Sequence, residues 1–149
     1  MAQLGLAGIG HVALKVSDIE RSLAFYRDRL GFAEMMRLHR DDGSLWLVYL
    51  RVTDTQFIEI FPEGEGDRAP GRERTAINHF CLECDNLDVT AAALRAEGIA
   101  LTVEPKLGAD GNRQCWIDDP DGNRIEFMQM APDSMQAEAI RRMRRMIQS

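Results

Sequence analysis

The chain has 149 residues, of which 45% are hydrophobic and 28% charged, and its formal net charge is −6. This composition is typical of a globular protein rather than a disordered one, and the acidic balance argues against binding to nucleic acid. No apolar run reaches the roughly 20 residues that span a bilayer, and the N-terminus lacks the pattern of a signal peptide, so we expect a cytoplasmic protein without a membrane partner.

The first predicted elements are a strand that starts near Ile9 and a helix that follows it. Along the strand, alternation places Val12 and Leu14 on the side that should meet the helix, and His11 on the opposite side. Ser17 begins a capping box, so we expect the helix to start there, and Gly31 supplies its left-handed stop. The apolar stripe of this helix consists of Ile19, Leu23, Tyr26 and Leu30.

Three strands are predicted after this helix, and the whole pattern then occurs a second time. The second copy aligns His79 with His11, has a helix capped by Asp85 or Asn86, and ends that helix at Gly98. The predicted strands cover 33–39, 45–52 and 55–61 in the first copy and 99–104, 113–117 and 124–130 in the second. The sequence therefore predicts an α+β fold of two tandem βαβββ modules.

These modules are predicted to form one domain over residues 1–131. Module one covers about 6–61, the linker 62–74 and module two about 75–131. The linker is rich in glycine, proline and charge, and it is too short to separate independent domains. Residues 132–149 form a helical tail capped by Ser134 or Asp133, which we expect to pack on its own domain; a partner subunit is the alternative surface.

The strongest functional signal is that histidines and glutamates fall on equivalent positions of the two copies. Glu59 in FIEIF superposes on Glu126 in RIEFM, as His11 does on His79. A glutamate within an apolar strand is costly to bury without a cation, a donor or solvent. A lone strand histidine is more often scaffolding, but the coincidence of all four under one repeat predicts one divalent metal ion.

These ligands would suit Ni²⁺, Co²⁺, Zn²⁺, Mn²⁺ or Fe²⁺, because two imidazoles and two carboxylates form a mixed nitrogen and oxygen set. Such an ion acts as a Lewis acid on a chelating substrate, and Glu126 or Glu59 is then the candidate base. The same strand faces supply candidate substrate-binding residues. Two are basic and suit an anionic group, although a solvated rim position is equally compatible, and the others are apolar: Lys15, Arg124, Phe57, Phe61 and Met128.

The segments GHVALKV, SLAFYRDRLGF, FIEIF, NHFCLEC and DPDGNRIEF together resemble the vicinal oxygen chelate superfamily over about residues 6–131. Its members include glyoxalase I, methylmalonyl-CoA epimerase, extradiol dioxygenases, and fosfomycin and bleomycin resistance proteins. The resemblance implies that the two modules form a curved mixed sheet around a metal cavity. The complete His-Glu-His-Glu set is most similar to glyoxalase I, which implies a lyase or isomerase, favours Glu126 as the base and implies a homodimer. Lys15 and Glu63 replace the arginine and asparagine usual in glyoxalase I, which argues against glutathione as co-substrate.

Two other functions within the superfamily remain alternatives. A dioxygenase or a fosfomycin-type thiol transferase would use three protein ligands instead of four. A resistance protein similar to the bleomycin-binding members would sequester a drug without a metal. Metal content separates this last class from the enzymes.

Overall fold

The computed structural model describes residues 5–66 and 68–148. The chain divides into two compact units, residues 1–68 and 69–149, and the boundary falls in the predicted linker segment. Each unit contains a four-stranded mixed sheet. The structure thus has the predicted α+β class, with the order βαβββ present twice.

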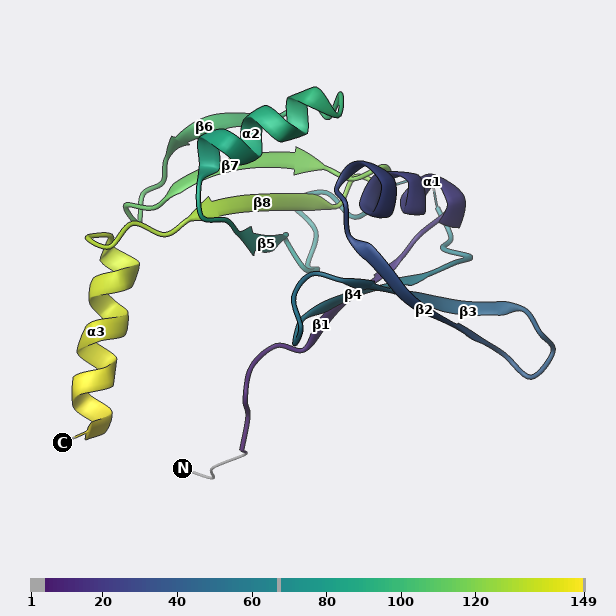
Figure 1. The fold of residues 1–149 in the computed structure, drawn as a ribbon, viewed down its shortest axis with the longest axis horizontal. Coiled ribbons are helices and arrows are strands. Elements are labelled where there is room, and N and C mark those ends of the chain that lie inside the picture. Colours follow the sequence, from purple (N-terminus) through teal and green to yellow (C-terminus); the bar gives the residue numbers. More distant parts are fainter. Residues whose placement is uncertain (1–4, 67, 149) are drawn as a thin grey trace. The chain divides into compact units, whose positions relative to one another are not determined.

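In unit 1 the strand order is β1-β4-β3-β2 (Figure 1). Strand β1 pairs in parallel with β4, and the other neighbours are antiparallel. Leu14 and Val16 are buried while His11 is exposed, so the predicted alternation of β1 is confirmed. The elements are β1 (His11–Lys15), α1 (Ile19–Leu23), the π-helical turn η1 (Ala24–Arg29), β2 (Ala33–His39), β3 (Leu45–Arg51) and β4 (Phe57–Phe61).

The first helix differs from its prediction at the start and in the middle. Its N-cap is Asp18, whose carboxylate accepts the backbone N–H of Arg21 at 3.0 Å, whereas the Ser17 hydroxyl accepts the Arg21 guanidinium instead. The wider π-helical turn carries Phe25 to the buried side together with Tyr26, and their rings meet edge to face at 5.1 Å. Gly31, with φ of 77°, follows the helix as predicted.

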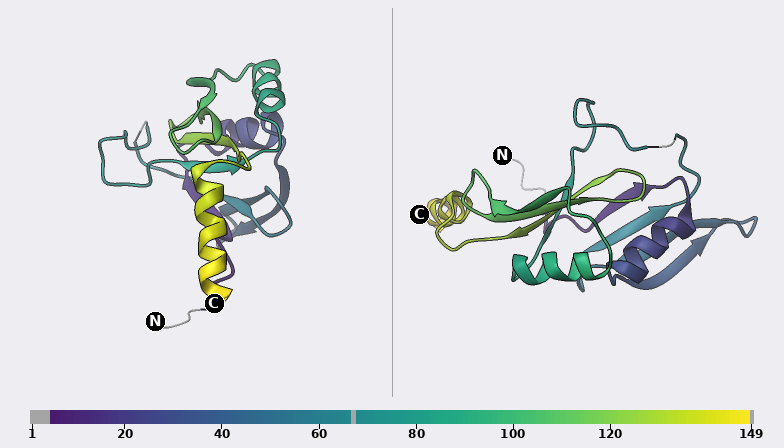
Figure 2. Two further views of the ribbon diagram at one scale, coloured as in Figure 1. Left: turned by 90° about the vertical axis from the view of Figure 1, so that its left-hand side faces the viewer. Right: turned by 90° about the horizontal axis from the view of Figure 1, so that it is seen from above.

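In unit 2 the order is β5-β8-β7-β6, the same arrangement as in unit 1. Helix α2 covers one face of this sheet (Figure 2) and buries the predicted Leu87, Ala91 and Leu94. Asn86 is its N-cap. The elements are β5 (Phe80–Glu83), α2 (Leu87–Ala96), β6 (Val103–Leu107), β7 (Arg113–Asp118), β8 (Arg124–Gln129) and α3 (Met135–Gln148).

Strand β6 begins later than the predicted 99–104. The backbone N–H of Ile99 donates to the carbonyl of Leu94 at 2.9 Å, and the Ile99 side chain is buried. The apolar residue that suggested a strand therefore closes the end of α2.

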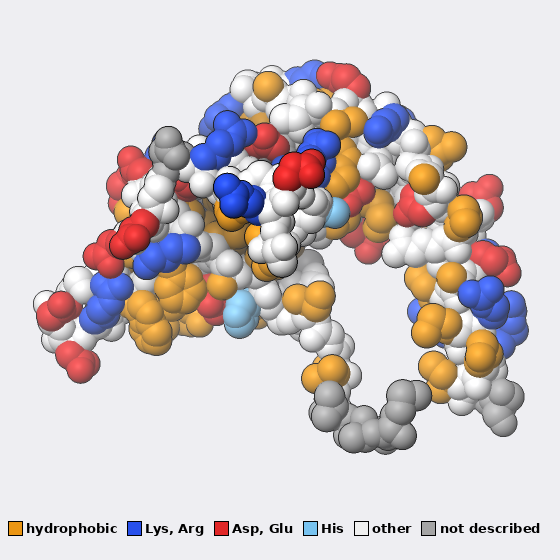
Figure 3. Space-filling view, turned by 180° about the vertical axis from the view of Figure 1, so that it is seen from behind, with side chains coloured by type: hydrophobic (Ala, Val, Ile, Leu, Met, Phe, Trp, Pro, Cys, Tyr) orange, Lys and Arg blue, Asp and Glu red, His pale blue; other side chains and the backbone are white. Residues whose placement is uncertain are grey.

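The C-terminal helix α3 contacts its unit mainly through its first turn. Ser134 caps it, because its hydroxyl accepts the backbone N–H of Ala137 at 3.1 Å, and both residues are buried. Further along, Met143, Met146 and Ile147 are 60–81% exposed, and apolar and basic side chains lie side by side there (Figure 3). The expectation that this helix packs along its own domain is met only in the first turn. Among the described residues, no helix is both long and apolar enough to cross a membrane.

Candidate functional site

Unit 1 brings His11 and Glu59 together through the parallel pairing of β1 with β4. Ala13 is the register partner of Glu59, and His11 lies two residues before Ala13 on the same face. His11 Nδ1 is 3.6 Å from Glu59 Oε1; the imidazole is half exposed, whereas the carboxylate side chain is 9% exposed. The pair joins an accessible nitrogen ligand to a largely buried oxygen ligand.

Unit 2 builds the same pair by the same register. Cys81 is the partner of Glu126, and His79 lies two residues before Cys81. His79 Nε2 is 3.2 Å from Glu126 Oε2, and the glutamate side chain is 12% exposed. The residues that the repeat alignment made equivalent between the copies thus have equivalent partners in the two units.

The imidazole of His79 is held by neighbours that unit 1 lacks. Asn78 Oδ1 lies 2.9 Å from His79 Nδ1 and also accepts from the Arg124 guanidinium at 3.2 Å. Because an amide oxygen cannot donate, Nδ1 carries the hydrogen, which leaves Nε2 to face Glu126. The Trp116 ring packs edge-on against this imidazole at 4.7 Å. The residue before His11 is Gly10, which has no side chain to act in this way.

The two glutamates also differ in their neighbours on the adjacent strand. Tyr49 is the register partner of Glu59. Its hydroxyl donates a hydrogen bond to the Glu59 carboxylate, and this bond is the main reason why the pKa of Tyr49 is raised. Trp116 takes the equivalent place beside Glu126, but its indole N–H donates to Gln114 at 2.7 Å. Glu126 instead has the Cys81 thiol beside it, which is a weaker donor than a phenol.

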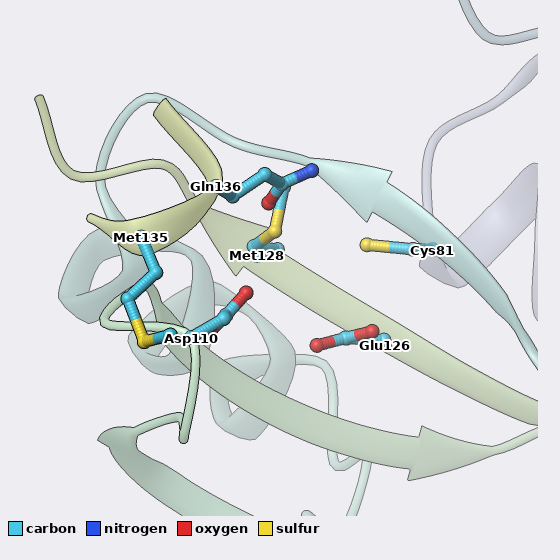
Figure 4. A pocket seen from close by; sticks show the side chains of 6 residues that line it. All are labelled: Cys81, Asp110, Glu126, Met128, Met135 and Gln136. Atoms are coloured by element: carbon cyan, nitrogen blue, oxygen red, sulfur yellow. The ribbon is translucent and has the colours of Figure 1, made fainter. Parts of the chain in front are cut away.

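Glu126 borders a pocket of about 550 Å³ that lies within unit 2 (Figure 4). The walls come from β5, β8, the loop between β6 and β7, and the first turn of α3. The lining residues are Cys81, Asp110, Glu126, Met128, Met135 and Gln136. Of this set, Glu126 and Met128 were candidate site residues from the sequence, whereas Asp110 and the two residues of α3 lie outside the repeat-equivalent ligand strands and were not predicted.

The sequence matches the family model described as the Glyoxalase/Bleomycin resistance protein/Dioxygenase superfamily over residues 8–127. The chain belongs to this superfamily. The match includes both histidine–glutamate pairs and ends before α3. The match confirms the resemblance proposed from the sequence. The superfamily contains both enzymes and non-enzymatic proteins, and its members commonly bind a divalent metal.

Two curated relatives and one solved structure illustrate this membership. The chain is 29% identical to the lactoylglutathione lyase of Haemophilus influenzae, over 80% of this chain and 90% of that protein. It is 27% identical to human mitochondrial methylmalonyl-CoA epimerase, over 71% of this chain and 63% of that protein. The crystal structure of lactoylglutathione lyase from Agrobacterium tumefaciens is 26% identical, with a TM-score of 0.62 over 83% of this chain and 94% of that one.

The five predicted substrate-binding residues do not share one environment in the structure. Met128 lines the pocket, whereas the Arg124 guanidinium stacks on Trp116, 4.3 Å from its ring centre. The remaining three lie in unit 1, at paired positions of β1 and β4. Lys15 is exposed there, and Phe57 and Phe61 are half buried.

The donor chemistry in each unit fits a divalent ion. His79 Nε2 lies 3.2 Å from a carboxylate oxygen of Glu126, and an imidazole nitrogen beside a carboxylate is a ligand pair that a divalent transition ion accepts. Within either unit, the described residues contain no group of three or more metal-ligating side chains. The four-ligand site requires a pair from each unit and stays a prediction.

Proposed function

We propose that this protein is a metal-dependent lyase or isomerase that removes a proton from a small, oxygen-chelating substrate. The observation that carries the proposal is the histidine–glutamate pair, built by the same strand register in each unit. His11, Glu59, His79 and Glu126 would hold one Ni²⁺, Co²⁺, Zn²⁺, Mn²⁺ or Fe²⁺ ion. When bound, this ion would supply Lewis acidity to the chelated substrate. Similarity to a lactoylglutathione lyase and a methylmalonyl-CoA epimerase supports this reaction class.

Within this proposal Glu126 is the general base and Glu59 the more firmly held ligand. The Tyr49 hydroxyl restrains Glu59, whereas Glu126 has only a thiol as its comparable neighbour and borders the pocket. A base must reach the substrate carbon, take up a proton and return it, so the less restrained carboxylate at the pocket suits this role. Glu59 is the alternative base.

The leading substrate is the hemithioacetal that methylglyoxal forms with a thiol. Glutathione is a poor choice for this thiol, because Lys15 lacks the planar fork that binds a carboxylate and Glu63 would repel one. In the structure Glu63 is exposed, and it accepts a hydrogen bond from Arg40 at 3.2 Å. A homodimer and a cytoplasmic location remain predictions from the sequence.

Metal content is the first test of this function. Elemental analysis of gently purified protein should find close to one transition ion per chain, either retained or regained after removal with a chelator. A chain that neither retains nor rebinds any of the five metals would overturn the proposal and leave the metal-free binding protein as the alternative.

Turnover of the hemithioacetal by metal-loaded variants is the second part of the test. Replacing Glu126 with Gln should lower kcat on the order of 10²-fold or more, because an amide cannot accept the proton. The control is Glu104→Gln, which removes an exposed carboxylate on β6 that pairs with Arg95. Near-wild-type rates for both Glu126→Gln and Glu59→Gln, or a requirement for O₂, would refute proton transfer and favour the dioxygenase alternative.

A further inference from the structure

Most of the far wall of the unit 2 pocket lies outside the part of the chain that matches the superfamily model. Met128, Met135 and Gln136 line the pocket but lie beyond residue 127, where the family match ends. Asp110 completes this wall from the loop between β6 and β7. A substrate group that extends from Glu126 into the pocket would therefore meet side chains that the family pattern does not describe.

A buried asparagine fixes the polar groups of this wall. Asn112 is fully buried, and its Nδ2 donates to Asp110 Oδ2 at 2.7 Å and to Gln136 Oε1 at 2.6 Å. Since one nitrogen binds both, the carboxylate and the amide lie side by side. The backbone N–H of Met135 also donates to the Asp110 carbonyl at 2.8 Å, which ties the start of α3 to the loop.

This network determines what the wall offers to a ligand. The oxygen of Gln136 accepts from Asn112, so its Nε2 remains as a donor, and none of the described residues accepts a hydrogen bond from it. Figure 4 shows this nitrogen directed toward the Cys81 side of the pocket. Asp110 contributes acceptor oxygens only. The wall thus presents a donor next to an acceptor, with the apolar Met128 and Met135 beside them.

We propose that Gln136 and Asp110 bind a neutral, amide-bearing arm of the substrate, with Gln136 donating to its carbonyl and Asp110 accepting its N–H. This inference rests on the proposed function, in which the chelating end of the same substrate lies at Glu126. An amide matches the wall because it has an acceptor and a donor in one plane. The two methionines would contact the methylene groups that join the arm to the chelating end.

Charge excludes an anionic arm. The pocket contains the carboxyl groups of Asp110 and Glu126, and no lysine or arginine is among the described residues that line it. Arg113, which follows Asn112 in the chain, is engaged by both oxygens of Asp88 at 2.8 Å each. A carboxylate arm would face two like charges without a basic partner, which agrees with the doubt about glutathione raised by Lys15 and Glu63.

Calorimetric binding of three hydroxamic acids to the metal-loaded full chain tests this assignment without turnover. The compounds share one chelating head and one linker length, and they end in a primary carboxamide, a carboxylate or an isopropyl group. We expect the carboxamide compound to bind about tenfold more tightly than the other two compounds. This difference is about what one additional satisfied hydrogen bond contributes to binding.

Gln136→Glu is the matching variant, because it keeps the oxygen that accepts from Asn112 and removes the N–H donor. It should abolish the preference for the carboxamide and leave the affinity for the isopropyl compound unchanged. Met143→Glu adds the same charge at an exposed position further along α3 and should keep the preference.

Equal affinities for the three compounds, or a preference that survives in Gln136→Glu, would overturn the inference. Metal binding and turnover would in that case still support the proposed function. A protein that binds neither the ion nor any hydroxamate would refute the proposed function, and this inference with it.

Discussion

Replacing Asn112 with Ala should destabilise unit 2 by about 3 kcal/mol, because this side chain joins three separate segments. It donates to Asp110 and Gln136, and its Oδ1 accepts the backbone N–H of Ala131 at 3.0 Å. Alanine supplies none of these interactions. The loop between β6 and β7, the end of β8 and the start of α3 would lose their common partner.

The magnitude follows from the partners that stay behind. A hydrogen bond to a charged acceptor such as Asp110 contributes about 1.5–3 kcal/mol, and a buried backbone N–H left without a partner costs about 1–3 kcal/mol. Water entering the vacated space would satisfy part of this loss. With this compensation, the estimate of about 3 kcal/mol lies in the lower part of the combined range of about 2.5–6 kcal/mol.

Urea unfolding of the full chain, monitored by circular dichroism, measures this change. Asn86→Ala is the control, because Asn86 is an exposed N-cap that accepts from two backbone N–H groups and should contribute about 1 kcal/mol. If Asn112→Ala lowered the free energy of unfolding by no more than Asn86→Ala does, the network around Asn112 would not have the role assigned to it.

Two further predictions concern the second histidine and the buried thiol. Asn78→Ala frees the His79 ring and should therefore weaken metal affinity about 10- to 100-fold, as measured in a competition with a chelator. Asn78→Asp keeps the acceptor oxygen and should restore the affinity. Equal affinity in the wild type and both variants would contradict this positioning role. Burial raises the pKa of Cys115 to about 11, so this thiol should resist alkylation at pH 8 until the protein unfolds. Because the folded pKa lies above the unfolded value of about 9, stability should fall as pH rises from 9 to 11, and this part of the loss should be absent in Cys115→Ala.

The duplicated frame was predictable from sequence because it depends on local periodicity. Alternating strands and capped helices recur in the same order in both copies, and strand periodicity places His11 and Glu59 on definite faces. Register then follows from the parallel pairing of the first and last strand of each module. For this reason each histidine lies close to the glutamate of its own unit, whereas the predicted meeting of all four residues at one metal ion stays a prediction.

The features that the sequence analysis missed depend on tertiary context. Ile99 looks like a strand residue, but its burial against the end of α2 gives it a different role. The π-helical turn that buries Phe25 has no local sequence signature. The pocket wall depends on Asn112 joining Asp110 to Gln136, and no periodic pattern relates these three residues.

The repeat also explains why equivalent ligands need not have equivalent roles. Strand register fixes where Glu59 and Glu126 lie, whereas the neighbouring strand determines what each can do. Tyr49 donates to Glu59, but the equivalent Trp116 directs its N–H to Gln114 and packs against His79. A carboxylate with a fixed donor is suited to hold an ion, and one without it is freer to turn toward a substrate and exchange a proton. If the proposed function holds, these differences at the supporting positions would make Glu59 the better ligand and Glu126 the better base, although the ligand pattern itself is symmetrical.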